Sequence, residues 1–250
     1  MNPALVTAAM ALAFCTVHVF VGKLRFLDRA PRSRWLSFAG GVAVGYVFLH
    51  ILPELGSHAV AFERAIGLPP TLSESWVYAL ALGGLVLFYG IERALKISRG
   101  DRRAEEGRDR PEHGVFWLHI GASALLIAVI AYLLNHREEA TTGGLALFFA
   151  AMMLHLVTAD YGARREHPEL YDRRGRWVLV AATLAGWFVG TRLVLPPVVI
   201  GGLFAFVGGC IVVVVLKEEL PEERKSYFLP FFAGAAIYSA LVIGELHLAV

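Results

Sequence analysis

Three histidines and one aspartate lie within apolar stretches of the chain, where ionisable side chains are rare. These residues are His18, His119, His155 and Asp160. Burying an ionisable group inside a membrane helix is costly, so each of the four is a candidate functional residue. Counted along a helix, the three histidines fall within a few residues of one level, near the same end of their segments. Imidazoles that face one another at such a level are suitable ligands for a divalent transition metal such as zinc.

Each of these residues also has a simpler interpretation. A histidine near a helix end can reach the membrane interface or bond a neighbouring backbone carbonyl. Asp160 follows His155 by five residues, which places the two side chains about 140° apart around a helix. With Arg164 and Arg165 close behind it, Asp160 is most simply interpreted as part of a surface ion pair. The predicted metal-binding residues are nevertheless His119, His155 and Asp160.

A second pair of candidates stands at the far end of the second apolar segment. His50 and Glu54 are four residues apart, so they share one face of a helix. An imidazole and a carboxylate together can receive a cation from solvent, which makes the pair a candidate outer access site. The alternative is that both residues lie at the membrane interface and only close the helix.

These residues are carried by eight apolar segments, which we predict to be membrane-spanning helices. The chain is 57% hydrophobic and 18% charged, whereas soluble chains are typically about half apolar and a quarter charged. A bilayer core about 30 Å thick needs about 20 apolar residues per helix, and continuous runs of this length exclude barrel strands. The predicted spans are 3–22, 35–52, 76–91, 115–134, 143–162, 177–191, 198–216 and 228–246. We therefore expect an all-α protein with one membrane domain over 1–250.

The basic residues predict how these spans are oriented. Of the 23 Lys and Arg residues, 20 lie in alternate connections, which are 23–34, 93–110, 164–176 and 217–225. Because cytoplasmic loops are enriched in Lys and Arg, these connections are expected to face the cytoplasm, with both termini outside. The protein is then a multi-pass protein of the cell membrane. The charged segment 92–114 is expected to be a cytoplasmic loop that begins as a solvated extension of the third helix.

The second and seventh segments resemble each other. Each contains a glycine pair, at 40–41 and 208–209, and each is followed by Leu-Pro-Glu, at 52–54 and 220–222. The two segments are expected to cross the membrane in opposite directions, and matched elements of opposite direction are typical of transporters built from inverted repeats. Coincidence is the alternative, because proline often follows the end of a helix.

The second segment also resembles a helix of a known family. The run from Gly41 to His50-Ile-Leu-Pro-Glu54 is similar to the second helix of the ZIP family of divalent metal transporters, which commonly ends in a His-Leu-Leu-Pro-Glu-like string. The stretch 206–241 is similar to that family's last pair of helices. The resemblance implies eight helices, both termini outside, a variable cytoplasmic loop between helices 3 and 4, and an inverted relation between helices 1–3 and 6–8.

The chain departs from the ZIP pattern at the metal site. ZIP transporters carry a histidine followed four residues later by Asp or Glu in both helix 4 and helix 5. Here His119 is followed by Ser123, and His155 is followed by Ala159. A cation bound within lipid needs anionic ligands to offset its lost hydration, so two neutral imidazoles predict weak binding.

Two hypotheses follow from these residues. The first is a ZIP-like transporter that moves a divalent cation, with zinc expected, by alternating access and without a covalently bound cofactor. The second is a ZIP-fold membrane protein that does not transport metal and acts through a partner or another solute. An intramembrane enzyme is least expected, because the chain contains no Walker loop, GxSxG elbow or HExxH helix. The expected partners are the lipid bilayer and a divalent metal ion, with a homodimer left open and no nucleic acid.

Overall fold

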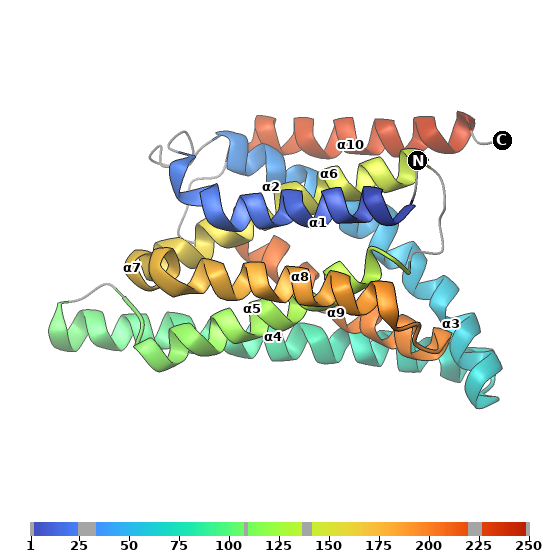
Figure 1. Cartoon of the computed structure of the whole chain (residues 1–250), viewed down its shortest axis with the longest axis horizontal. Coiled ribbons are helices and arrows are strands. Elements are labelled where there is room, and N and C mark those ends of the chain that lie inside the picture. Colours follow the sequence, from blue (N-terminus) through green and yellow to red (C-terminus); the bar gives the residue numbers. More distant parts are fainter. Residues whose placement is uncertain (1–2, 25–33, 108–109, 137–141, 220–226, 249–250) are drawn as a thin grey trace.

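The computed structural model describes residues 3–24, 34–107, 110–136, 142–219 and 227–248 (Figure 1). These residues are almost entirely helical, and the described part of the chain contains no β-strand. The α-helices are α1 (Pro3–Phe20), α2 (Arg34–Tyr46), α3 (Leu52–Ile66), α4 (Pro70–Glu106), α5 (His113–Leu133), α6 (Thr142–Glu166), α7 (Pro168–Leu170), α8 (Arg176–Arg192), α9 (Pro197–Glu219) and α10 (Phe228–Leu248). A 3₁₀ turn, η1 (Val21–Lys23), and two π turns, η3 (Val47–Ile51) and η4 (Tyr171–Gly175), join some of them. The prediction of an all-α protein is confirmed for this part of the chain.

Seven helical segments within the described residues are long and apolar enough to cross a membrane. They are Ala4–Lys23, Arg34–Ile66, Pro70–Glu105, His113–Leu133, Gly143–Glu166, Pro197–Leu216 and Phe228–Glu245. The remaining predicted span corresponds to α8, which is helical but has only 17 residues. The structure therefore indicates a multi-pass membrane protein.

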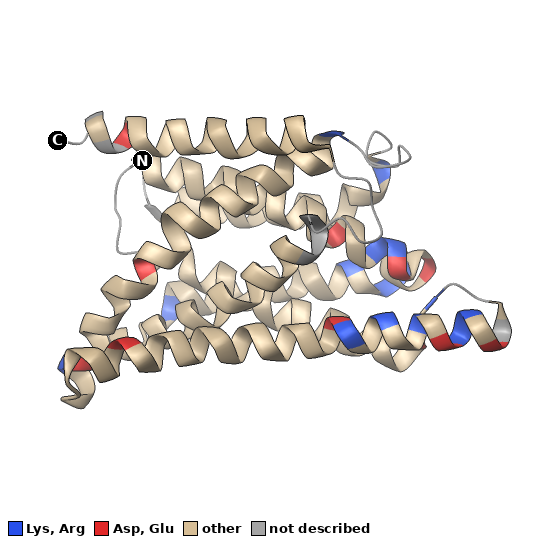
Figure 2. Cartoon of the chain, turned by 180° about the vertical axis from the view of Figure 1, so that it is seen from behind, with Lys and Arg blue, Asp and Glu red and all other residues tan. Residues whose placement is uncertain are grey.

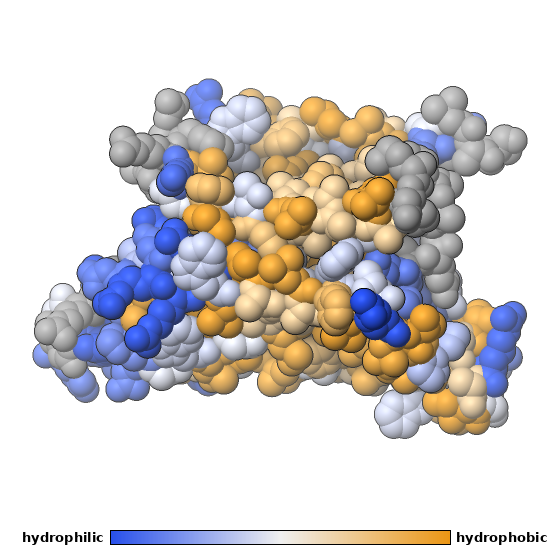
Figure 3. Space-filling model, in the orientation of Figure 1, coloured by the Kyte–Doolittle hydropathy of each residue, from blue (hydrophilic) through white to orange (hydrophobic). Residues whose placement is uncertain are grey.

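The helices run along one common direction, as expected of a membrane bundle. The start of α1 and the end of α10 lie at the same end of the bundle (Figure 1). Lys and Arg gather mainly at the opposite end (Figure 2). Apolar residues cover the middle of the molecule in the space-filling view (Figure 3). Large exposed side chains of α4 and α10, including Leu82, Val86, Phe232 and Leu241, contribute to an apolar surface that suits the bilayer core.

The second predicted span is longer than the sequence indicates. We expected it to end at residue 52, before Pro53, but α2, η3 and α3 together continue to Ile66. Pro53 lies in the first turn of α3, directly after the π turn Val47–Ile51. Proline removes one helical hydrogen bond and crowds the preceding turn, and a wider turn relieves that crowding. The helix therefore passes Pro53 rather than ending there. The Leu-Pro-Glu at 220–222 lies outside the described residues.

The third predicted span is also extended. The helix α4 continues through the charged sequence as far as Glu106, well beyond the predicted end at residue 91. It ends where Gly107 adopts a left-handed conformation, with a φ of 66°. The helix α3 ends in the same way at Gly67, which has a φ of 70°. Glycine has no Cβ to oppose this conformation, so it commonly ends a helix in this way.

Glycine allows several pairs of helices to approach each other closely, as in α5 and α8, where a Cβ at Gly186 would overlap the carbonyl oxygen of Ala128. Two further pairs share one arrangement. In the pair α2 and α10, a Cβ at Gly41 would overlap the carbonyl oxygen of Phe231, and a Cβ at Gly234 would overlap that of Phe38. Such contacts bring the two backbones together without intervening side chains, which is the usual role of small residues between membrane helices.

The pair α4 and α9 repeats this arrangement. A Cβ at Gly84 would overlap the carbonyl oxygen of Phe206, and a Cβ at Gly209 would overlap that of Ala81. The two contacting positions in α2, Phe38 and Gly41, precede those in α9, Phe206 and Gly209, by the same 168 residues. The glycine pairs found in the sequence therefore occupy equivalent places in two helix pairs.

Candidate cation-binding site

A small cavity inside the bundle is lined by all three predicted metal-binding residues, His119, His155 and Asp160. Its volume is about 40 Å³, which is enough for an ion or a water molecule. The ionisable residues and the two substituted positions on its wall are Glu92 of α4, His119 and Ser123 of α5, and His155, Ala159 and Asp160 of α6. We call this the inner cavity. His119 and His155 thus line one space, and so do Ser123 and Ala159, which follow them by four residues.

Both histidines of the inner cavity are buried, with 5% of His119 and 3% of His155 exposed. Within the described residues, the Nδ1 atom of each ring has no hydrogen-bond partner. A buried polar atom without a partner is costly and calls for an explanation, such as a ligand. Two such imidazoles beside one cavity are of the residue type that coordinates transition metals.

Glu92 is a further candidate residue that the sequence analysis did not single out. Its Oε1 atom lies 3.2 Å from Nε2 of His119, and its side chain is only 10% exposed. When His119 donates from Nε2, its Nδ1 carries the free lone pair, as in the carboxylate–histidine pairs that orient metal ligands. The carboxylate nearest His119 in this cavity is therefore contributed by α4. Its spacing from the buried residues Gly84 and Phe88 places it on the inner face of α4, a signal that the sequence contains.

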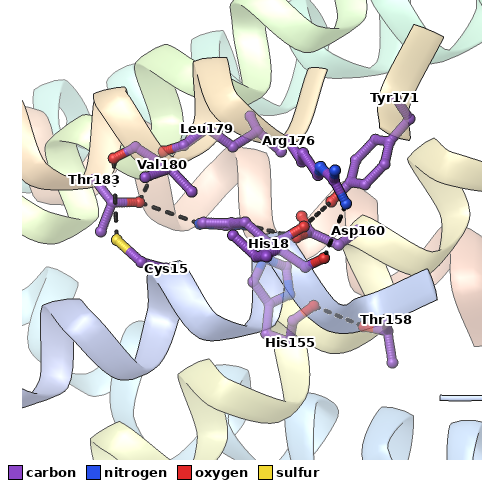
Figure 4. A network of polar contacts seen from close by, with 11 residues as sticks. Cys15, His18, His155, Thr158, Asp160, Tyr171, Arg176, Leu179, Val180 and Thr183 are labelled. Carbon is purple, nitrogen blue, oxygen red and sulfur yellow. Dashed lines mark hydrogen bonds and ion pairs between the residues drawn. The ribbon is translucent and has the colours of Figure 1, made fainter. Parts of the chain in front are cut away.

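Asp160 is buried rather than part of a surface ion pair, so that interpretation was wrong. It is 2% exposed, and its Oδ2 atom lies 2.6 Å from Nδ1 of His18, which is completely buried. Figure 4 shows His18 between Asp160 and Thr183. Arg164 instead makes a two-point contact with Asp172, at 2.8 Å for each bond. The orientation of α6 about its own axis turns Asp160 towards α1, and the sequence alone does not predict this orientation.

The order Thr183, His18, Asp160 resembles a hydrolase triad, but the hydroxyl is not accessible. Nε2 of His18 lies 3.1 Å from Oγ1 of Thr183, and Oγ1 also lies 2.9 Å from the carbonyl oxygen of Leu179. Thr183 and His18 are both completely buried, so a substrate cannot reach the hydroxyl as a nucleophile would require. The geometry suits a structural link between α1, α6 and α8.

The two residues of the predicted outer access site point to different places. Nδ1 of His50 lies 3.0 Å from the hydroxyl of Tyr238, and the His50 ring stacks on Tyr46. Glu54 instead lines a second cavity of about 30 Å³, together with His58 and His136. His50 lines neither cavity. The π turn that contains His50 adds a residue to the helix, which shifts the faces on its two sides relative to each other by about 100°.

The second cavity, which we call the outer cavity, lies on the same line through the bundle as the inner one. Ile130 of α5 lines both cavities. The lining residues of α5 follow a three- and four-residue spacing along one helical face, from His119, Ser123 and Ile127 to Ile130 and Leu133. The face of α6 that carries Phe148, Met152, His155 and Ala159 does the same. The two cavities therefore lie one after the other along the same faces of α5 and α6, with the apolar side chain of Ile130 in the wall of both.

In the part of the chain that the structure describes, no three His, Cys, Asp or Glu side chains converge closely enough to hold a metal ion. The inner cavity thus offers two imidazoles and an orienting carboxylate, so an ion there would complete its coordination with water or after a local movement.

Comparison with known proteins adds no relative: no family model, no curated protein and no solved structure matches this chain.

Proposed function

We propose that this chain is a ZIP-like membrane transporter of a divalent cation, with zinc as its best substrate. The inner cavity carries the proposal, because His119 and His155 both line it and the Nδ1 atom of each ring has no hydrogen-bond partner in the described chain. Neutral imidazole is a preferred ligand of zinc and of neighbouring transition metals. Potassium, sodium and calcium favour oxygen ligands, so they fit this cavity less well.

Glu92 supplies the negative charge that the ZIP-like positions lack. It orients His119 through the Nε2 contact of 3.2 Å and places a carboxylate beside the cavity. Asp160, a second acid on the cavity wall, is shared with His18. The proposed ligands are therefore His119 and His155, with Glu92 as the residue that holds His119 in the right tautomer.

The route for the ion is the line of cavities between the facing surfaces of α5 and α6. Ile130 separates the inner from the outer cavity, so in this conformation the two are not joined by polar groups. Alternating access requires such a barrier, which shifts when one group of helices moves against the other. The glycine-bound pairs, α2 with α10 and α4 with α9, are suited to move as units.

The proposed architecture has eight spans, with α8 as the sixth and both termini outside. At 1.5 Å per residue, α8 is about 26 Å long, slightly shorter than the bilayer core, and a small mismatch of this kind is tolerated. The gathering of Lys and Arg at the end opposite the start of α1 supports the orientation (Figure 2). An impermeant thiol reagent applied to intact cells should not label Glu105→Cys, and labelling of that variant from outside would overturn the orientation.

We propose further that helices 1–3 and 6–8 form an inverted repeat. In this repeat α2 corresponds to α9, and α4 corresponds to α10. The packed pair α2 and α10 then corresponds to the packed pair α9 and α4. The contacts of Gly41 and Gly234 likewise correspond to those of Gly209 and Gly84. Equivalent contacts at a constant offset support a duplicated unit more strongly than the sequence match does by itself.

The second candidate is a membrane protein of the same fold that does not transport metal. It is favoured by the lack of three converging ligands within the described residues and by the pairing of both cavity acids with imidazoles. Under this hypothesis, His119 and His155 serve packing and the chain acts through a partner or another solute.

Zinc uptake by vesicles separates the two candidates. The purified full chain would be reconstituted into liposomes that contain a zinc indicator. We expect uptake by the native chain and at least about a tenfold lower initial rate for His119→Gln, His155→Gln and Glu92→Gln, since loss of an orienting carboxylate alone costs about 10–100-fold. Glu105→Gln, an exposed position of the same helix as Glu92, is the matched control. A native chain that takes up no zinc would reject metal transport and favour the second candidate.

A further inference from the structure

We propose that the outer cavity, lined by Glu54 and His58 of α3 and by His136 beyond the end of α5, is a second binding site for the transported divalent cation, which these side chains contact together with water. This inference rests on the proposed function, because the ion is the same. It assigns a binding role to His58 and His136, which the sequence does not single out, and gives none to His50.

His58 is built into the wall of the cavity. It is 3% exposed, and its ring lies 4.8 Å from that of Phe204, centroid to centroid. A Cβ at Gly201 would lie 3.2 Å from Cβ of His58, so the glycine on α9 makes room for the histidine. An imidazole fixed in an apolar bundle by a neighbouring glycine is costly to keep unless it has a use.

Glu54 and His58 can act on one ion because they share a helical face. They are four residues apart within α3, beyond the π turn, and both line the outer cavity. Glu54 thus contributes a carboxylate and His58 an imidazole from the same side. This combination of ligands is common for zinc and its neighbours among the transition metals.

His136 has the hydrogen bonding of a metal-ligand histidine. Its Nε2 atom lies 2.9 Å from the carbonyl oxygen of Gly190. A carbonyl only accepts, so Nε2 carries a proton and, in the neutral ring, Nδ1 carries the lone pair. Metal-binding histidines are usually held in this way by a carbonyl or carboxylate. The ring is also stacked on Tyr132, at 4.5 Å between centroids, which fixes its orientation.

The position of the outer cavity gives the site its role. It meets the inner cavity at Ile130, so an ion that enters from the side of Glu54 reaches this site first. No three ligands converge within the described residues, so the ion keeps part of its water here. A station on a transport route must bind firmly enough to capture the ion and weakly enough to release it.

Zinc titration of the detergent-purified full chain against a chromophoric chelator tests this inference. The native chain should bind two zinc ions. His58→Gln should weaken one of them by at least about tenfold, and His119→Gln should weaken the other. His136→Gln keeps a donor for Gly190 but lacks the lone-pair nitrogen, so it should act like His58→Gln. His50→Gln is the matched control and should retain both sites. Size-exclusion profile and far-ultraviolet circular dichroism would verify that each variant is folded.

The outcomes separate the two proposals. One site that is lost only with His119→Gln would overturn the outer site and leave the proposed function standing. One site that is lost only with His58→Gln would reject the inner site and support the outer one. Loss of a site with His50→Gln but not with His58→Gln would also overturn the assignment. A chain that binds no zinc would overturn both proposals.

Discussion

The Nδ1 atom of His18 and the Oδ2 atom of Asp160 lie 2.6 Å apart, and neither side chain has more than 3% of its surface exposed. The contact joins α1 to α6, and Thr183 on the other ring nitrogen extends it to α8. Three helices that are distant in sequence thus meet at one imidazole. Because taking both groups out of water is costly, the arrangement is stable only while both partners are present.

Removing one partner of this pair should therefore destabilise the protein strongly. We expect Asp160→Ala or His18→Ala to lower the free energy of unfolding by about 3–5 kcal/mol, since each leaves a buried polar group unpaired. The double variant should lose less than the sum, with a coupling energy of about 1–3 kcal/mol. Unfolding in mixed micelles gives all four values. Additive losses would mean that the two side chains do not act as a pair.

Carboxylates introduced at the inner cavity should strengthen zinc binding. Ser123 and Ala159 both line the cavity with His119 and His155. In Ser123→Asp with Ala159→Glu, two anions would join the imidazoles and offset the lost hydration of the ion. We expect at least about a tenfold gain in affinity by calorimetry, as is typical for added ionic ligands worth about 1.4 kcal/mol or more. Adding His119→Ala should abolish the gain, and a gain that persists would place the ion elsewhere.

Two neighbouring glycines of α4 should respond in opposite ways to the same substitution. A Cβ at Gly84 would overlap the Phe206 carbonyl, whereas a Cβ at Gly83 finds nothing within 4 Å. Gly84→Ala should force α4 and α9 apart and cost about 1–3 kcal/mol. Gly83→Ala should be neutral or stabilise the helix by up to about 1 kcal/mol, because alanine is the better helix former. Thermal unfolding in detergent compares the two, and equal effects would contradict the close contact.

The histidine just beyond the end of α6 should make stability depend on pH. Burial lowers the pKa of His167, and the nearby His113 and Arg110 lower it further, while Glu169 opposes them. The folded chain then binds this proton less readily than the unfolded chain does, so the stabilisation is complete above the ordinary pKa of about 6.5 and declines as the pH falls below it.

The melting temperature should accordingly fall as the pH is lowered from about 7 to about 5, a range that begins at the ordinary histidine pKa of about 6.5. His167→Gln should reduce that decline, and His247→Gln, at an exposed position of α10, serves as the control. If the decline is unchanged in His167→Gln, another group is responsible for it.

The course of the helices follows from the sequence more directly than their ends do. A run of about 20 apolar residues can be recognised directly in the linear sequence, and all eight predicted segments are helical. The helix passes Pro53 because a π turn accommodates it, and α4 continues through charged residues that favour helix in water. Both extensions run beyond the apolar stretch that marks a membrane span, so a hydropathy pattern does not reveal them.

The sequence predicts how far along its helix each candidate residue lies, but not towards which neighbouring helix its side chain points. The level of His119 and His155 could be counted along their helices, whereas the rotation of α6 that buries Asp160 depends on its packing against α1 and α2. Glu92 is a second example, because in the sequence it is the first residue of the predicted charged loop. Only its alignment with Gly84 and Phe88 reveals that it faces inwards. Position around a helix axis is a property of tertiary contacts.

Gly41 and Gly209 are 168 residues apart and make equivalent helix contacts, so a substitution at one can be compared with the same substitution at the other. Under the proposed inverted repeat, the two glycines sit at equivalent joints that face opposite sides of the membrane. A bulky residue at one joint and the same residue at the other should therefore bias the transporter in opposite senses, one towards the outside and one towards the cytoplasm. A single chain thus provides a perturbation and its mirror image.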